Sequence, residues 1–207
     1  SGLRAVMDAA NCLRVGEWSA VVAGGMESMS NAPHLLERSR QGFRMGEIKM
    51  TDSMVKDGLR DPYGDKHMGN CGELCVTKYG FTREDQDAFA LGSYKKAQAA
   101  AEAGKFADEL VSVPVPQKKG EPVLFAKDEG PFSAPLDKMP TLKPVFDAAG
   151  TITAANASPV NDGAAALVVT TAERAKALGL KPLARIVSQG SVAQEPEWFT
   201  TAPAVAA

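Results

Sequence analysis

Apolar residues at the start of the chain recur at the spacing of an α-helix. Leu3, Val6, Ala10 and Leu13 are three or four positions apart and therefore share one helix face. Gly16 follows them, and glycine is favoured just beyond the last turn of a helix. The pattern predicts a helix that begins at the first residues and ends shortly before this glycine.

Shorter apolar runs predict strands. Residues 19–23 precede two glycines and are typical of a buried strand in a parallel sheet. Further strands are expected over 150–155 and 183–190, and within 161–171, where a turn or short helix leads into a buried strand. Alternating apolar residues over 110–116 indicate extended chain.

Three more helices are expected. One covers residues 69–79 and ends at the glycine that follows. A longer one opens at Thr82, with Asp85 as the partner of this threonine in a capping box. The last opens at Thr170 or Thr171.

The alternation of strands and helices predicts an α/β fold with a layered sheet. Residues 31–68 are the exception, because they have no sustained period and indicate a long, partly irregular excursion. The chain has 23 basic and 25 acidic residues, a balance that gives no reason to expect nucleic acid or an anionic membrane as partner. No apolar run reaches the ~18 residues of a transmembrane helix.

Few side chains suggest a site by their type alone. His34 and His67 are the only histidines, and neither belongs to a recognisable Ser-His-Asp set. Cys71 and Cys75 have helical spacing but lack a second ligand pair, so small buried thiols are favoured over a zinc site. Cys12 is the third cysteine, and an odd count indicates a reducing compartment rather than a disulfide framework.

Three strings together carry a resemblance. They are AGGMESMS at 23–30, HMGNCGE at 67–73 followed by TREDQDAFALGSYKKA, and GTITAANASPVNDGAAA at 150–166. With AGKFADEL and LKPVF, they resemble the thiolase family, and within it the short-chain acetoacetyl-CoA branch. The resemblance runs in order through essentially the whole chain.

The resemblance implies a layered α-β-α-β-α fold of two similar halves, with a loop domain inserted in the first. On this basis, residues 1–29 belong to the first half, and 30–160 form the loop domain. Residues 161–181 return to the first half, and 182–207 start the second.

The resemblance also locates the nucleophile outside the chain. Thiolases have a Cys-x-Ser-Gly turn before this helix, so the cysteine is expected two residues before Ser1. A thiolate is stabilised at a helix N-terminus, which suits a nucleophile. The Asn and His motifs and a second cysteine are expected after Ala207, so this chain by itself is expected to be inactive.

By the same resemblance, what the chain contributes is mainly the coenzyme A site. Ser158 would lie beside the pantetheine, and His67 would reach towards it. The alternative for Ser158 is a helix cap, and the alternative for His67 is a surface histidine whose hydrogen bonds are satisfied within the protein. Arginine is common in the family where Pro131 and Phe132 stand here, and Lys138 or Lys143 is the substitute for it. The full set of expected coenzyme A positions is Leu59, His67, Met68, Phe146, Ala154, Ala157 and Ser158.

A monovalent cation is a further expectation from the resemblance. Potassium-responsive thiolases surround the ion with a tyrosine and the carbonyl groups of an alanine-rich loop. The matching positions are Tyr63, Ala154, Ala155 and Ala157. The alternative is a hydrogen-bonded tyrosine without an ion.

The implied reaction joins two acetyl-CoA molecules into acetoacetyl-CoA and CoA, or runs in reverse as thiolysis. The alternatives are a degradative 3-ketoacyl-CoA thiolase of broader chain length and a non-catalytic CoA-binding or assembly fragment. Acyl-CoA and other copies of the chain are the expected partners, without nucleic acid or membrane. Residues 34–49 are either a loop that joins tight dimers into a tetramer or a solvated loop. The expected compartment is the cytoplasm, with the mitochondrial matrix as alternative.

Overall fold

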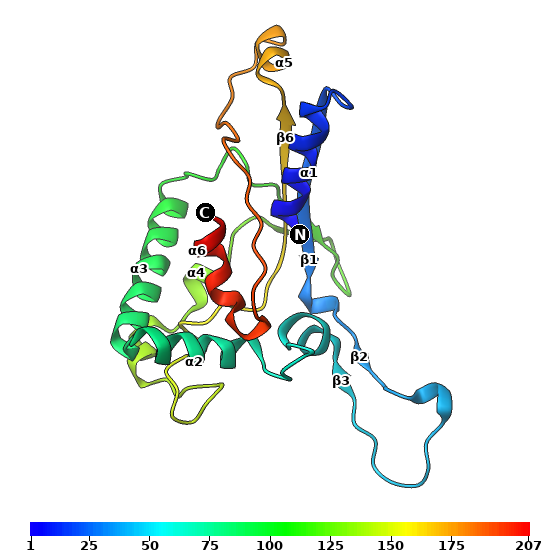
Figure 1. Ribbon diagram of the computed structural model, residues 1–207, viewed down its shortest axis with the longest axis vertical. Helices are drawn as coiled ribbons and strands as arrows, with labels where there is room; N and C mark the ends of the chain where they lie inside the picture. The colour runs from blue at the N-terminus through cyan, green and yellow to red at the C-terminus, as the bar shows by residue number, and fades with distance from the viewer. The chain divides into compact units, whose positions relative to one another are not determined.

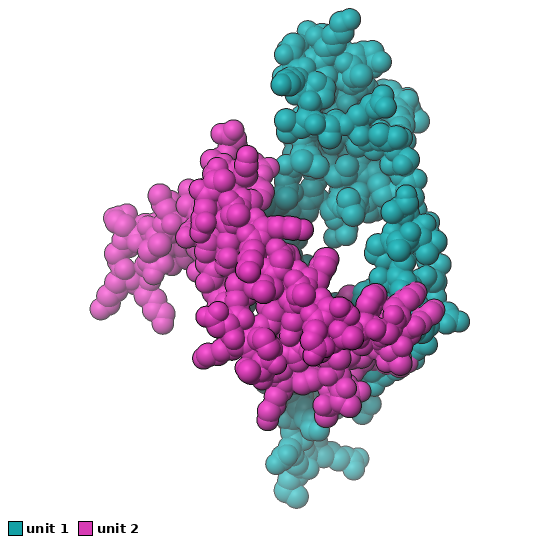
Figure 2. All heavy atoms as spheres, turned by 90° about the vertical axis from the view of Figure 1, so that its left-hand side faces the viewer, with its two compact units in different colours: residues 1–65, 160–207 teal, residues 66–159 magenta.

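The computed structural model describes all 207 residues, which form two compact units (Figures 1 and 2). Unit 1 contains residues 1–65 and 160–207, and unit 2 contains residues 66–159. Both mix helices with short strands. No helix combines the length and the apolar composition needed to cross a bilayer.

A helix on a two-stranded sheet forms the main body of unit 1. Helix α1 (Gly2–Arg14) confirms the first predicted helix. It packs on strand β1 (Ala20–Ser28), which pairs antiparallel with β6 (Asp162–Thr170) (Figure 1). The pair is tight at Gly24, where a Cβ atom would lie 2.1 Å from the Ala165 carbonyl oxygen. Only glycine therefore fits at this point of the strand.

Three strand predictions in unit 1 are corrected. The strand at 19–23 is longer than expected and antiparallel, and Val22 is 72% exposed because α1 covers only the opposite face. Residues 162–170 are strand throughout, without a leading turn or helix, and are mostly exposed. Residues 183–190 form no strand. Their apolar side chains lack a covering layer, and Leu183 is fully exposed.

Short elements make up the rest of unit 1, and those within 31–59 agree with the irregular pattern predicted for 31–68. The end of β6 leads through Thr171, whose hydroxyl accepts from the Arg174 amide, into α5 (Ala172–Ala177). The remaining elements are η1 (Met29–Asn31), β2 (His34–Leu35) paired with β3 (Thr51–Asp52), η2 (Ser39–Gln41), the π-helix η3 (Met54–Leu59), η5 (Pro196–Thr201) and α6 (Ala202–Ala206).

Unit 2 is built on two consecutive helices, both as predicted. Helix α2 (Met68–Tyr79) ends at Gly80, which is left-handed with φ 68°. Helix α3 (Arg83–Glu102) starts with the complete capping box of Thr82 and Asp85. The other elements of unit 2 are β4 (Val113–Val115) paired antiparallel with β5 (Val123–Phe125), α4 (Gly130–Ser133) and η4 (Leu136–Thr141).

The strand expected over 150–155 is absent from unit 2. The backbone amides of Thr151 and Ile152 donate to the Glu73 carboxylate, and the Thr153 amide donates to Asn156. Side chains therefore take the place of a neighbouring strand. Ser158 starts no helix, so the interpretation of this residue as a helix cap is also wrong.

Candidate functional site

Residues 151–158, called here the 151–158 loop, carry three of the expected coenzyme A positions. One end of the loop is fixed by Glu73 of α2. Its Oε1 accepts from the amides of Thr151 and Ile152, both at 2.8 Å, and its Oε2 accepts from the Thr151 hydroxyl at 3.1 Å. One carboxylate thus satisfies three donors of the loop.

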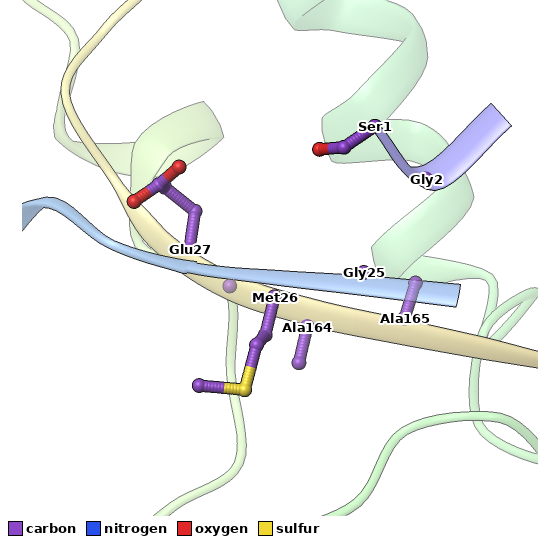
Figure 3. A pocket seen from close by; sticks show the side chains of 8 residues that line it. Ser1, Gly2, Gly25, Met26, Glu27, Ala164 and Ala165 are labelled. Atoms are coloured by element: carbon purple, nitrogen blue, oxygen red, sulfur yellow. The ribbon is translucent and has the colours of Figure 1, made fainter. Parts of the chain in front are cut away.

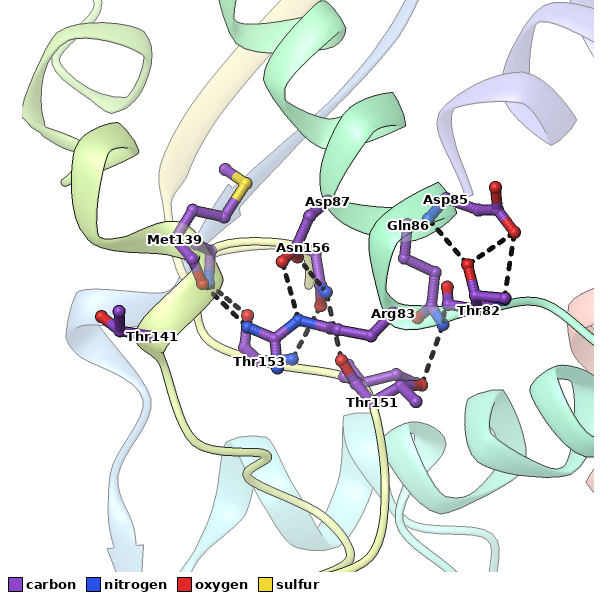
Figure 4. Close-up of polar contacts among 12 residues, drawn as sticks. Thr82, Arg83, Asp85, Gln86, Asp87, Met139, Thr141, Thr151, Thr153 and Asn156 are labelled. Carbon is purple, nitrogen blue, oxygen red and sulfur yellow. Dashed lines mark hydrogen bonds and ion pairs between the residues drawn. The ribbon is translucent and has the colours of Figure 1, made fainter.

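The middle of the loop is fixed by Asn156, which is held in turn by α3. The Asn156 side chain donates to Asp87 Oδ1 at 2.9 Å and to the Thr151 carbonyl at 3.2 Å, and it accepts from the Thr153 amide at 2.7 Å. Asp87 forms an ion pair with Arg83 at 2.8 Å, and both side chains are mostly buried. Arg83 also donates to the Met139 carbonyl (Figure 4).

This anchoring separates the two faces of the loop. Thr153 and Ala155 are buried, whereas Ala154 and Ser158 are exposed. None of the hydrogen bonds that fix the loop uses the Ser158 hydroxyl or the carbonyl oxygens of Ala154, Ala155 and Ala157. These groups are the ones left for a ligand.

The start of α2 brings three more expected positions together. His67 is the N-cap, and its Nδ1 accepts from the Gly69 amide at 3.0 Å. Its ring stacks on Phe146, with centroids 4.8 Å apart, and Met68 follows it on the helix. The Phe146 carbonyl accepts from Asn70 at 3.0 Å. A neutral imidazole whose Nδ1 accepts carries its proton on Nε2, so His67 can offer a donor to a ligand.

The remaining expected positions belong to unit 1. Leu59 ends the π-helix η3 and is half-buried. Tyr63 follows in a turn in which Asp61 accepts from the amides of Tyr63 and Gly64. Its ring is 85% exposed.

A second feature of unit 1 is an open hollow of about 440 Å³ at the first turn of α1. It is lined by Ser1 and Gly2, by residues 25–27 of β1 and by residues 163–165 of β6. Figure 3 shows the Glu27 and Ser1 side chains on the helix side of the strands, with Met26 on the other side. Ser1 does not cap the helix with its side chain. Ser1 and Gly2, at the positive end of α1, line this hollow.

The three cysteines have no comparable setting. Partial burial raises the pKa of the Cys12 thiol, and the neighbouring Glu17 and Asp8 raise it further. Cys71 is buried in α2, as predicted, and Cys75 lies one turn later. A raised pKa and burial both disfavour a reactive thiolate.

The cationic positions near the predicted nucleotide end include one that the pattern did not suggest. Lys127 lies over the ring of Phe132, with 4.2 Å between Nζ and the ring centroid. Lys138 and Lys143, the substitutes considered for the missing arginine, are both exposed. Lys127 is therefore a third candidate for that role.

Sequence reasoning also missed the residues that hold the 151–158 loop. Glu73 ends the HMGNCGE string, and Asn156 is the central residue of AANAS. For Asn156 the only available signal was a polar residue inside an apolar loop, and Glu73 on α2 gave none, because their partners are 69 to 79 positions away in the chain.

Comparison with known proteins gives the family of the chain. The thiolase N-terminal domain matches residues 1–173. The chain belongs to the thiolase family. It is 54% identical over 204 residues to an acetyl-CoA acetyltransferase of Cupriavidus necator, and 46% identical over 207 residues to one of Schizosaccharomyces pombe. These matches cover 98% and 100% of the chain and 52% of each relative, so the chain spans about half the length of these relatives.

Solved thiolase structures share the fold. The Acat5 thiolase of Ascaris suum, solved in complex with coenzyme A, gives a TM-score of 0.89 at 41% identity. The acetyl-CoA acetyltransferase of Bacillus anthracis gives 0.92 at 39% identity. Both comparisons cover all of this chain and 52% of the other chain. The expected thiolase-like α/β fold is thereby confirmed.

Proposed function

We propose that this chain is part of a thiolase-type acetyl-CoA C-acetyltransferase. The reaction joins two acetyl-CoA molecules into acetoacetyl-CoA and CoA, or cleaves acetoacetyl-CoA with CoA. The observation that carries the proposal is the likeness of the whole chain to a thiolase solved with coenzyme A. The shared name of the relatives supports the short acyl substrate.

The coenzyme A arm is the part of the substrate that this chain holds in the proposal. Pantetheine is a thin chain with two amide groups, so small side chains such as Ala154 and Ala157 admit it. The exposed Ser158 hydroxyl and the Nε2 proton of His67 are available to fix its register. Met68, Phe146 and Leu59 supply apolar walls.

The hollow at α1 is the proposed position of the acetylated cysteine. The thiolate attacks the thioester carbon of acetyl-CoA, the bond from that carbon to the sulfur of CoA breaks, and the CoA thiolate leaves. The positive end of α1 stabilises the attacking thiolate. A base then removes a proton from the second acetyl-CoA, and its enolate carbon takes the acetyl group from the cysteine. The base and the oxyanion donors are proposed to lie beyond residue 207.

Domain limits and assembly remain part of the proposal. Residues 30–160 are proposed as the loop domain, between the 1–29 and 161–181 segments of the first half, with 182–207 opening the second. Residues 34–49 are proposed to join dimers into a tetramer. Exposed apolar side chains in this segment, among them Phe43, Met45 and Ile48, support a protein contact rather than a solvated loop.

The proposal also includes a potassium ion bound at Tyr63, Ala154, Ala155 and Ala157. The carbonyl oxygens of these alanines are hard donors that the loop does not use for its own anchoring. Activity of the full-length protein should be higher in potassium than in sodium at equal ionic strength. Equal activity in the two salts would remove the ion from the proposal.

The test of the function is thiolysis by the full-length protein that contains this chain. Acetoacetyl-CoA and CoA are mixed with the protein, and the loss of the acetoacetyl-CoA enolate absorbance is followed. A 3-ketoacyl-CoA with a longer chain is compared at the same concentration. We expect preference for acetoacetyl-CoA. Preference for the longer substrate would indicate a degradative thiolase, and absence of both reactions would contradict the proposal.

A further inference from the structure

We infer that Glu73 is a positioning residue of the coenzyme A site. Its carboxylate holds the 151–158 loop on α2, the same helix whose first turn is capped by His67. The inference rests on the proposed function, because it gives Glu73 a role in binding acyl-CoA. Glu73 itself needs no contact with the substrate.

The geometry makes α2 a common base for two binding groups. His67 and Glu73 are six positions apart, which corresponds to about 9 Å along a helix axis. At the N-terminal end the helix fixes the imidazole through the Gly69 amide, and at Glu73 it fixes the backbone that leads to Ser158. The spacing between the imidazole and the serine hydroxyl therefore depends on the carboxylate.

The loop backbone is shaped to receive this carboxylate. Gly150 leaves the necessary room, since a Cβ atom there would lie 2.4 Å from Glu73 Oε1. The amides of Thr151 and Ile152 donate to Glu73 and take part in no strand ladder. Removal of the carboxylate leaves two partly buried amides unpaired, and the loop must move to find water.

The Asn156 anchor limits the structural effect of losing Glu73 to the 151–158 loop. Asn156 is held by Asp87 of α3, and its side chain also binds the Thr151 carbonyl and the Thr153 amide, so it is coupled to the segment that Glu73 holds. Loss of Glu73 removes three hydrogen bonds from the start of the loop, whereas Gln86 still donates to the Thr151 hydroxyl and the Val145 amide to the Ile152 carbonyl. A shift of Thr151 moves Asn156, which donates to the Thr151 carbonyl, and so displaces Ser158 two residues later without unfolding unit 2.

The experiment compares three variants of the full-length protein in the thiolysis assay. Glu73→Ala should raise the KM for acetoacetyl-CoA about tenfold, which corresponds to a loss of about 1.4 kcal/mol in binding free energy. The change in kcat should be smaller. Glu73→Gln should restore a KM close to that of the wild type, because the amide oxygen can accept from both backbone amides. Glu102→Ala is the matched control, since this exposed glutamate at the end of α3 holds no loop.

A double variant separates positioning from a purely structural effect. If Glu73 acts through the loop, then Ser158→Ala should add little to the KM of Glu73→Ala. Additive effects, a melting temperature that falls with KM unchanged, or a Gln variant as defective as the Ala variant would each overturn the inference. If Glu73→Ala does not fold, Gly150→Ala displaces the carboxylate and should raise KM in the same way.

Failure of the proposed function gives a different result. In that case the wild-type protein shows no thiolysis before any variant is made. Coenzyme A affinity measured by calorimetry on the same proteins then tests Glu73 without turnover. A Glu73→Ala protein that binds coenzyme A as tightly as the wild type would overturn the positioning role.

Discussion

The ring of Phe146 lies so close to Gly69 that the glycine has no room for a side chain. A Cβ atom at Gly69 would be 2.2 Å from Cδ2 of this ring, well inside van der Waals contact. The same ring stacks on His67, whose Nδ1 accepts from the Gly69 amide. Ring, imidazole and helix start are thus packed as one group, and the orientation of His67 depends on this glycine.

Gly69→Ala should therefore destabilise the protein although alanine is the better helix former. The methyl group must displace an aromatic ring held by its neighbours, and overpacking of this kind costs about 1–3 kcal/mol. Thermal unfolding of the full-length protein should show a lower melting temperature, and the KM for acyl-CoA should rise as His67 moves.

Gly92→Ala provides the control for this prediction. Gly92 lies within α3, and a Cβ atom there meets nothing within 4 Å. Alanine should stabilise the helix by about 0.5–1 kcal/mol, because glycine loses more backbone entropy on folding. Equal melting temperatures for the two variants would contradict the packing argument at Gly69.

The parts of the fold that the sequence predicts well are those set by neighbours in the chain. The ends of α2 and α3 follow from Gly80 and from the Thr82–Asp85 pair, because a left-handed glycine and a capping box act within a few residues. The His67 position was found for a different reason, since it lies in a string that resembles a known family.

The errors arise where a distant partner decides the structure. Residues 150–155 have the composition of a strand, but Glu73 satisfies the amides of Thr151 and Ile152 from 78 and 79 positions away. The direction of β1 could not be read from its own residues either, because the sheet order depends on β6. Apolar composition predicted burial for both strands, whereas α1 covers one face alone.

The capping box of α3 predicts a pH dependence with a definite sign. Hydrogen bonds from the hydroxyl and then the amide of Thr82 hold the pKa of the Asp85 carboxyl below its ordinary value of 3.8. A carboxyl whose pKa is lowered by folding stabilises the folded state above the unfolded pKa. That contribution is lost as the pH falls through the folded pKa.

A peptide of residues 80–104 tests this sign by circular dichroism. Asp85→Asn should reduce helix content at pH 7, and the two peptides should converge as the pH approaches 2. Glu102→Gln at the other end should raise helix content at pH 7, because a negative charge is unfavourable at a helix C-terminus. If the difference in helix content between the wild-type and Asp85→Asn peptides grew as the pH fell, the lowered pKa of Asp85 would be contradicted.

The 207-residue chain alone should not become acetylated. Its proposed nucleophile lies before Ser1, and Cys12 has a raised thiol pKa while Cys71 is buried. Incubation with radiolabelled acetyl-CoA, followed by intact mass spectrometry, should show the unmodified mass. The full-length protein treated in the same way is the positive control. A stable thioester on any cysteine of this chain would overturn the location of the nucleophile.

Ser158 should contribute to substrate binding and little to bond making. Its hydroxyl is exposed on the 151–158 loop, and no histidine or carboxylate among the loop's contacts is placed to activate it. Ser158→Ala should remove one neutral hydrogen bond to pantetheine, a loss of about 0.5–1.5 kcal/mol. By the tenfold ratio per 1.4 kcal/mol, the KM for acyl-CoA should rise roughly two- to twelvefold, with kcat changed less.

Ser133→Ala is the matched control for this prediction. Ser133 ends the short helix α4 in the same unit, and its hydroxyl reaches only the Gly130 carbonyl at 3.5 Å. It should leave both kinetic constants unchanged in the full-length protein. A fall of several orders of magnitude in kcat for Ser158→Ala, with KM unchanged, would mean that the hydroxyl takes part in the chemical step, because a group that only binds the ground state cannot produce that separation.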